Sequence, residues 1–488
     1  MTSSQTSTQT SAETATIPKP VVVILAVLVF TAFVMMLNET TLAVALPAIM
    51  ADYSIEANTA QWLLTGFMLT MAVVLPATGW ILERFTTRVV FIFATTIFLI
   101  GTVIAALAPT FPIMLGARVA QAIGTAVIMP LLMTVAMTVV PVQRRGAVMG
   151  LIAVVMAVGP ALGPSVAGVI LSFASWHMIF WVMVPLVGIA AVVGAIKIGN
   201  ISEPRSTPFD VFSLVLSAFA FGGLVYALSS IGAILDGGDA ARNALIILAV
   251  GVISLAVFVW RQLSLAKVDR ALLDLRPLAI RNFSIPLIVL LALFGALLGV
   301  MNTLPLYMQG SLLVSALVTG MVLLPGGLLE GVLSPFVGRI YDRRGPRALV
   351  ISGMALVVGS LFWLSTVDEN TGVGMLVAVH VIFSIGLALL FTPLITTALG
   401  SVPKHLYGHG SAIMNTLQQL AGAAGTAVMI AVYSTVSQSA MSSGATEQVA
   451  LADGANSAFF ACACVAVVAL VFALFIRPVP AQVDEGAE

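Results

Sequence analysis

The stretch VVVILAVLVFTAFVMML at residues 21–37 decides the fold of this chain, together with NETTLAVALP, which follows it at 38–47. About 20 apolar residues cross the hydrocarbon of a bilayer, so the stretch predicts a transmembrane helix. Glu39 then lies at membrane depth. A charged side chain there costs roughly 2.5–3.5 kcal/mol on insertion scales, which makes Glu39 a candidate functional residue.

The composition extends this prediction to the whole chain. Of its 488 residues, 60% are hydrophobic and 8% charged, with a mean hydropathy of +1.13, whereas a soluble domain carries about 25% charged residues. The formal net charge is zero, so nothing indicates a nucleic-acid partner. Cys462 and Cys464 are two positions apart, on different faces of a helix, and predict neither a disulfide nor a metal site. The sequence is that of a polytopic membrane protein.

Hydropathy predicts fourteen spans, all helical, because the apolar runs are longer than barrel strands and do not alternate. They are expected at about 21–46, 60–82, 89–108, 112–139, 147–172, 176–198, 211–231, 243–263, 283–306, 313–337, 348–367, 373–399, 410–436 and 456–476.

The basic residues fix the expected orientation. Eighteen of the 20 Lys and Arg fall in the alternate segments that share the side of the N-terminus, while Arg242 lies on the other side and Arg118 within a span. Cytoplasmic segments carry the excess of Lys and Arg. We therefore expect a multi-pass protein of the plasma (inner) membrane with both termini in the cytoplasm.

An internal repeat divides the chain. GWILERFTTR at 79–88 and GRIYDRRGPR at 338–347 share Gly, Ile, an acid, Arg and a final Arg, each 259 positions apart. Two similar bundles in parallel orientation are typical of transporters that rock around a central site. The expected units are a disordered tail at 1–19, a six-helix bundle at 20–198, two extra helices and a linker at 199–282, a second six-helix bundle at 283–477 and a tail at 478–488.

Three more motifs follow in order: RVAQAIG at 118–124, GPALGPSVAG at 159–168 and WHMIFWVMVP at 176–185. Together with the first span and the repeat, they resemble the major facilitator superfamily, specifically its fourteen-span drug:proton antiporter group. The resemblance implies an all-α fold of two six-helix bundles plus two additional helices. The chain departs from the group's pattern at Asn38, where the group has Asp, and at Ala43, where it has Asn.

The resemblance implies a latch between the bundles, in which an acid caps a helix N-terminus and pairs with Arg across the interface. The alternative for these basic segments is ordinary anchoring at the membrane surface. In the fifth span the resemblance implies a hinge and seal, and the alternative is a kinked packing helix. The latch candidates are Gly79, Glu83, Arg84, Arg88, Gly338, Asp342, Arg343 and Arg347; the hinge candidates are Gly159, Pro160, Gly163 and Pro164.

Two acids compete for the role of proton carrier. Glu39 is the first candidate, reaching the cavity from the position after Asn38, and Glu330, near the middle of the tenth span, is the second. Arg118 needs a buried partner, which Glu39 or the polar groups of the first span could supply. Glu330 has a structural hydrogen bond as its alternative, and His380 is more often a packing residue than a relay.

Polar residues on other spans are candidates for a substrate pocket or for interhelical hydrogen bonds. They are Trp62, Gln121, Asn415, Gln418 and Gln419.

The energy source follows by exclusion. The sequence has no G-x-x-x-x-G-K-[ST] phosphate loop, no metal-ligand set and no nucleophile constellation, so we expect neither an enzyme nor a cofactor. We expect a proton-coupled multidrug efflux antiporter that exports lipophilic, cationic compounds, with membrane lipid as its surroundings and a monomer as its working form. The alternatives are an exporter of an endogenous metabolite or lipid, and a membrane receptor or sensor that no longer transports.

Overall fold

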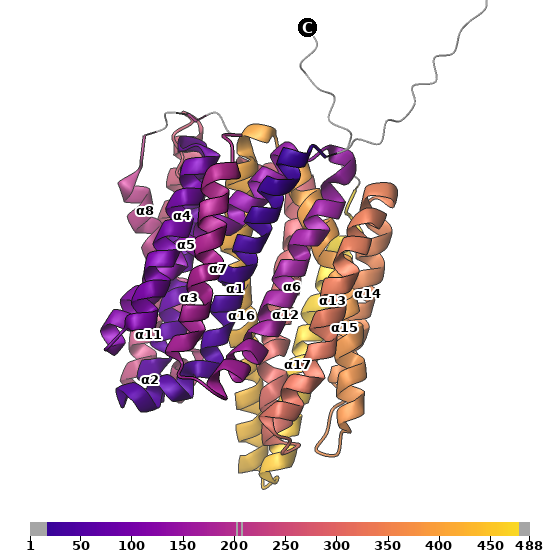
Figure 1. The fold of residues 1–488 in the computed structure, drawn as a ribbon. Coiled ribbons are helices and arrows are strands. Elements are labelled where there is room, and N and C mark those ends of the chain that lie inside the picture. Colours follow the sequence, from indigo (N-terminus) through magenta and orange to yellow (C-terminus); the bar gives the residue numbers. More distant parts are fainter. Residues whose placement is uncertain (1–16, 202–203, 206–207, 478–488) are drawn as a thin grey trace, which may run out of the picture.

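A computed structural model describes residues 17–201, 204–205 and 208–477. Within these ranges the fold is all-helical, with fourteen helices long and apolar enough to cross a membrane, as predicted (Figure 1). The terminal tails expected at 1–19 and 478–488 lie outside the described residues, apart from 17–19.

The first six spanning helices are α1 (Lys19–Tyr53), α3 (Trp62–Arg84), α4 (Thr87–Leu107), α5 (Phe111–Val139), α6 (Arg145–Leu171) and α7 (His177–Lys197). The last six are α12 (Arg281–Gly310), α13 (Ala316–Arg344), α14 (Arg347–Leu364), α15 (Val373–Gly400), α16 (Tyr407–Ser442) and α17 (Glu447–Ala473). Short helices α2 (Ala57–Ala60), η1 (Val142–Arg144), η3 (Arg276–Ala279) and η4 (Lys404–Leu406) lie in the connections.

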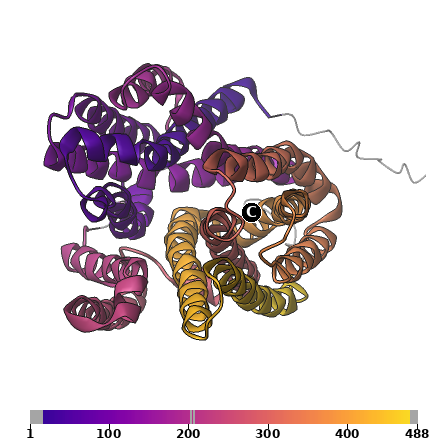
Figure 2. The same ribbon diagram turned by 90° about the horizontal axis from the view of Figure 1, so that it is seen from below.

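Two extra spans separate these sets. The first consists of α8 (Val211–Ser217), a π-helical turn η2 (Ala218–Gly222) and α9 (Gly223–Ser229); the short α10 (Ile231–Asp236) leads to the second, α11 (Gly238–Ala266). We call them the helix pair. The helix pair contacts α3 and α16, and viewed along the bundle it lies beside both sets of six helices (Figure 2).

Asp210 anchors the start of the helix pair. Its carboxylate accepts hydrogen bonds from the Ser213 backbone N–H and hydroxyl at 3.2 and 2.6 Å, and from Arg261 Nε on α11 at 2.9 Å. Burial raises the pKa of Asp210, but the hydrogen bonds from Arg261 and Ser213 outweigh it and hold that pKa below its usual value. The acid therefore caps α8 and ties it to α11.

The two sets of six helices meet along a seam of small residues between α6 and α13. A Cβ at Gly150 would lie 2.5 Å from the backbone oxygen of Ser334, and one at Gly338 would run into the carbonyl of Gly146. Without a hydrophobic driving force inside lipid, helices associate through such close packing. The seam holds the two backbones nearly in contact.

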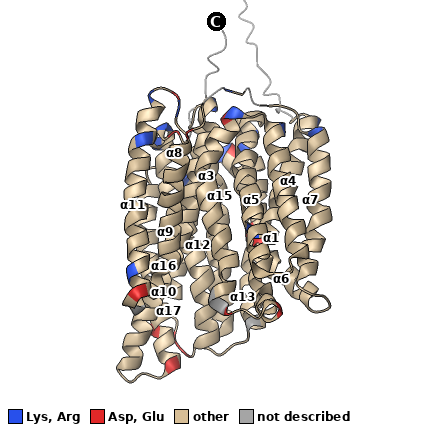
Figure 3. Ribbon diagram, turned by 90° about the vertical axis from the view of Figure 1, so that its left-hand side faces the viewer, with Lys and Arg blue, Asp and Glu red and all other residues tan. Residues whose placement is uncertain are grey.

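Charge divides the molecule into two ends (Figure 3). Most basic residues lie at the end where the described chain begins and finishes. We call this end the basic end, and the opposite one the acidic end. By the order of the spans, the connections at the basic end carry Arg84, Arg144, Arg205, Arg276 and Arg343, and those at the acidic end carry Asp52, Glu56, Asp368 and Glu447.

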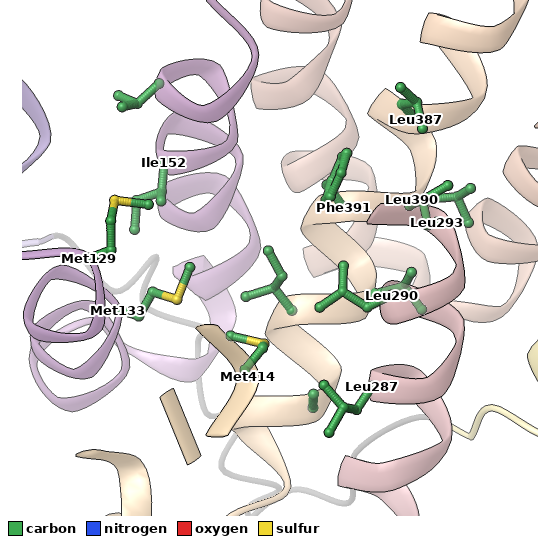
Figure 4. Packing of buried hydrophobic residues seen from close by; sticks show 14 of the residues in the cluster. Met129, Met133, Ile152, Leu287, Leu290, Leu293, Leu387, Leu390, Phe391 and Met414 are labelled. Atoms are coloured by element: carbon green, nitrogen blue, oxygen red, sulfur yellow. The ribbon is translucent and has the colours of Figure 1, made fainter. Parts of the chain in front are cut away.

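Side-chain burial is concentrated toward the basic end. Residues 124–133 of α5, 390–400 of α15 and 409–416 of α16 are all buried, whereas the part of α16 beyond residue 430 is mostly half-buried or exposed. Figure 4 shows Met129 and Met133 of α5 facing Met414 of α16 and the leucines of α12. The two bundles are thus closed against each other at the basic end.

Candidate functional site

A buried arginine organises the middle of the first bundle. Arg118 on α5 is 0% exposed, and its Nη1 donates to Asn38 Oδ1 on α1 at 3.2 Å and to Gln121 Oε1 at 2.9 Å. Its Nε donates to the Leu63 carbonyl at 3.4 Å, and the guanidinium lies 4.2 Å from the centre of the Phe67 ring. These contacts fix the cation at membrane depth, where snorkelling to the surface is impossible.

The same group of residues has more donors than acceptors. Gln121 uses its amide nitrogen on Thr102 Oγ1 at 3.0 Å, but Arg118 Nη2 and Asn38 Nδ2 are buried without a hydrogen-bond acceptor among the described residues. A buried unpaired donor is costly, so these two groups favour a nearby acceptor or negative charge. Glu39 is the adjacent acid.

Glu39 does not form an ion pair with Arg118 within the described ranges, although the two charges attract. On α1 the partner of Arg118 is the amide of Asn38. On the face of α1 that carries Glu39, Ala32 is 1% exposed, Glu39 is half-buried and Ala43 is exposed. Side chains on this face are buried toward the basic end and exposed toward the acidic end.

The Gly-Pro segment of α6, residues 159–168, packs against α1. Thr40 Oγ1 lies 3.4 Å from the Gly159 carbonyl, and a Cβ at Gly163 would run into the Thr40 side chain. Despite Pro160 and Pro164, α6 is one continuous helix. Of the four hinge candidates, Gly159 and Gly163 therefore lie where α6 meets the first span, whereas Pro160 and Pro164 are exposed.

Glu330 occupies the second bundle. It is 8% exposed on α13, and its carboxylate makes no hydrogen bond or ion pair within the described part of the chain. A Cβ at Gly331 would run into the side chain of Val158 on α6, and a Cβ at Gly326 would meet Ser384 Oγ and the His380 ring on α15. Glu330 is thus buried where α13 packs against α6 and α15, and it belongs to a different bundle from Glu39.

Asp342 caps a helix of the opposite bundle. Its carboxylate oxygens accept the backbone N–H groups of Gly146 at 2.7 Å and Ala147 at 2.9 Å, in the first turn of α6. A negative charge at a helix N-terminus is favourable because the unpaired N–H groups and the helix dipole point toward it. The two bundles are hydrogen-bonded to each other at this point of the basic end.

The four arginines of the repeat form no ion pair with the repeat acids among the described residues. All four are exposed, and none forms an ion pair in the ranges that the structure describes, so their pairing with the acids across the interface stays a prediction. An exposed guanidinium keeps its hydration, whereas the first turn of α6 offers backbone N–H groups that have no partner within the helix. These residues are Arg84, Arg88, Arg343 and Arg347.

Glu83, the acid of the first copy, faces a residue that the sequence analysis did not select. Its Oε2 lies 3.3 Å from His409 Nε2 at the start of α16, and its Oε1 lies 3.6 Å from Arg205 Nη1. A Cβ at Gly79 would run into the His409 ring. The available signal was the sequence YGHGSA at 407–412, a histidine between two glycines at the beginning of a span.

The five pocket candidates lie in three places. Gln121 belongs to the Arg118 network, and Trp62 stacks on Tyr226 of the helix pair at 6.1 Å between ring centroids. The other three are on α16. Asn415 Nδ2 lies 3.5 Å from Met133 Sδ and Gln419 Nε2 lies 3.6 Å from Met71 Sδ, across the bundle interface, while Gln418 Nε2 has no acceptor among the described residues.

No group of three or more His, Cys, Asp and Glu side chains that could hold a metal ion occurs among the described residues.

Comparison with known proteins identifies the family. The family model described as Major Facilitator Superfamily matches residues 28–426. The lincomycin resistance protein LmrB of Listeria monocytogenes is 39% identical over 93% of this chain and 96% of its own length. The uncharacterized MFS-type transporter YcnB of Bacillus subtilis is 37% identical over 93% of this chain and 95% of its own.

Among solved structures, the human organic anion transporter MFSD10 matches with a TM-score of 0.65 at 16% identity, covering 93% of this chain and 100% of that one, which shows a shared fold. The sequence match, the fourteen spans and the two packed bundles agree. The chain is an integral membrane protein that belongs to the major facilitator superfamily, and it is a transporter rather than an enzyme.

Proposed function

We propose that the protein exports lipophilic, cationic compounds in exchange for protons, by alternating access. The observation that carries the proposal is the arrangement around Glu39: a half-buried acid beside a fixed guanidinium, on a face of α1 whose side chains are buried toward the basic end. The relative named for lincomycin resistance supports the export of antibiotics.

The proposed orientation puts the basic end in the cytoplasm, because Lys and Arg concentrate on that side of membrane proteins. The moving units are then the bundles at 20–198 and 283–477, joined by 199–282. The closure at the basic end supports a state that is closed to the cytoplasm and accessible from outside. Asp342 on the N-terminus of α6 stabilises this state.

In this state Glu39 can take up a proton from outside. Desolvation favours the neutral form of a carboxyl group, and the neighbouring Arg118 favours the charged form. Movement of the bundles changes the balance between these two effects. Release of the proton toward the cytoplasm leaves a carboxylate that the unpaired donors of Arg118 and Asn38 stabilise.

Glu330 supplies a second acid, in the other bundle. Two acids at membrane depth attract a cation, and apolar walls with soft methionines, such as Met71 and Met133, accept varied shapes. A lipophilic cation is therefore the substrate class that these side chains fit.

The test uses purified protein in liposomes with an imposed pH gradient and a fluorescent lipophilic cation. We expect Glu39→Gln to abolish gradient-driven transport, Glu330→Gln to reduce it, and Glu56→Gln, which alters an exposed acid at the acidic end, to leave it unchanged. Transport that persists after the gradient is collapsed, or full activity in both buried-acid variants, would exclude proton coupling through these carboxyl groups.

A further inference from the structure

A chain of hydrogen bonds at the basic end joins the helix pair to both bundles. It begins at the start of the helix pair and follows residues 267–280, which join α11 to α12 and which we call the linker. It ends on α3. In order, its members are Asp210, Arg261, Ser213, Gln262, Leu273, Asp274, His409 and Glu83.

His409 connects the linker to both bundles: it lies on α16 of the second bundle and contacts the linker and α3 of the first bundle. Its Nδ1 accepts the backbone N–H of Asp274 at 3.2 Å, so Nδ1 carries no hydrogen. The hydrogen is then on Nε2, which donates to Glu83 Oε2 at 3.3 Å. The ring is 3% exposed and lies directly on Gly79, where any larger residue would displace it. One neutral tautomer thus serves the linker and the first bundle together.

The linker is itself firmly held. Asp274 accepts from the Arg276 backbone N–H at 2.9 Å and from Arg276 Nε at 2.7 Å, and this side-chain bond raises the pKa of the Arg276 guanidinium. The Leu273 N–H donates to Gln262 Oε1 of α11 at 3.1 Å, and Gln262 Nε2 donates to Ser213 Oγ of α8 at 2.7 Å. The backbone N–H that reaches His409 is therefore positioned by the helix pair.

We propose that His409 is a positioning residue of the gate at the basic end, and that through it the helix pair is a working part of that gate. This inference rests on the proposed alternating access. When α3 and α16 separate, the bond between His409 and Glu83 breaks while the Asp274 N–H keeps the ring in its tautomer. The Nε2–H then points in the direction from which Glu83 returns, and the gate closes again on a prepared donor.

The test measures how often the gate opens, without a proton gradient or a substrate. Ser411 is 0% exposed at the interface of α16 and α5, 3.3 Å from Thr134 Oγ1. In a background with Cys462→Ser and Cys464→Ser, Ser411→Cys is labelled by a membrane-impermeant maleimide from the basic side only when the bundles part there. The labelling rate of this background is the reference.

Three variants separate the proposal from simple packing. His409→Leu removes both bonds and is expected to raise the labelling rate about tenfold, the factor that corresponds to a hydrogen bond to a charged group. His409→Gln can accept from Asp274 and donate to Glu83, and is expected to stay within about twofold of the reference. His405→Leu changes an exposed histidine of the same end and is expected to have no effect.

Gln262→Leu tests the helix pair itself, because it frees the linker while His409 and Glu83 remain. We expect an increase in the labelling rate, smaller than that of His409→Leu. An unchanged rate in Gln262→Leu alongside a raised rate in His409→Leu would exclude the helix pair from the gate, and an unchanged rate in both would overturn the whole proposal. If His409→Leu does not fold, Glu83→Ala replaces it, with Glu83→Gln as its conservative partner. Since no proton gradient is used, loss of proton coupling would not imitate these results.

Discussion

Removal of the Asp342 carboxylate should open the basic end. Asp342 contributes two hydrogen bonds from a charged acceptor to the N-terminus of α6, at 2.7 and 2.9 Å. A bond to a charged group is worth about 1.5–3 kcal/mol, but Asp342 is half-buried and water can replace part of it. We therefore expect Asp342→Ala to weaken the closed state by about 1.5–3 kcal/mol in total, and Asp342→Asn, which keeps one acceptor, by about half of that.

These energies correspond to a shift of the closed-to-open ratio by roughly 10- to 100-fold for Ala and about tenfold or less for Asn. Spin labels at Lys197 and Arg347, both exposed at the basic end on different bundles, would report the shift as a longer distance in pulsed electron resonance. Asp453→Ala, an exposed acid on α17, is the matched control. The reasoning is refuted if the distance distribution of Asp342→Ala matches that of the wild type, or if the control shifts equally.

Three further predictions concern packing and charge. Gly338→Ala should lower the melting temperature and the transport rate, because its methyl group runs into the α6 backbone, whereas Gly116→Ala, which faces open space, should alter neither. Gly163→Ala should lower the transport rate, and adding Thr40→Ala should restore part of it; a double variant no better than the single one would argue against a clash with Thr40. Asp210→Asn should lower the melting temperature at pH 7. Since the folded pKa of this acid is depressed, its contribution is present above its unfolded pKa of about 3.9 and lost as the pH falls through the lower folded value, so thermal unfolding should show the difference disappearing in acid.

The sequence predicted the spans well, because helix formation in a membrane is dictated by local hydropathy: each apolar run must satisfy its own backbone hydrogen bonds. The Gly-Pro segment of α6 could be selected for the same reason, since small residues within an apolar helix mark close packing. What surrounds those glycines could not be predicted, because Met36 and Thr40 reach them from α1, more than 100 positions away.

The partners of individual side chains were the feature that the sequence predicted least well. The resemblance implied that the repeat acids cap a helix N-terminus and pair with arginine; Asp342 does cap α6, but the arginines of the repeat are exposed to solvent and Glu83 meets His409. Within the first bundle, the sequence left the partner of Arg118 open between Glu39 and the polar groups of the first span, and the structure gives the amide of Asn38. Charge can be counted in a sequence, whereas the geometry of a backbone N–H or an amide depends on tertiary packing.

The seam between α6 and α13 also matters for inhibition. Its faces are made of backbone at Gly146, Gly150 and Gly338, so a flat compound that entered while the bundles are apart would contact main-chain atoms that no substitution removes. Escape by a larger side chain would wedge the two helices apart and disable the transporter by the same route as the inhibitor. A compound directed at this seam should therefore select resistance far more slowly than one directed at a pocket of methionine and glutamine side chains.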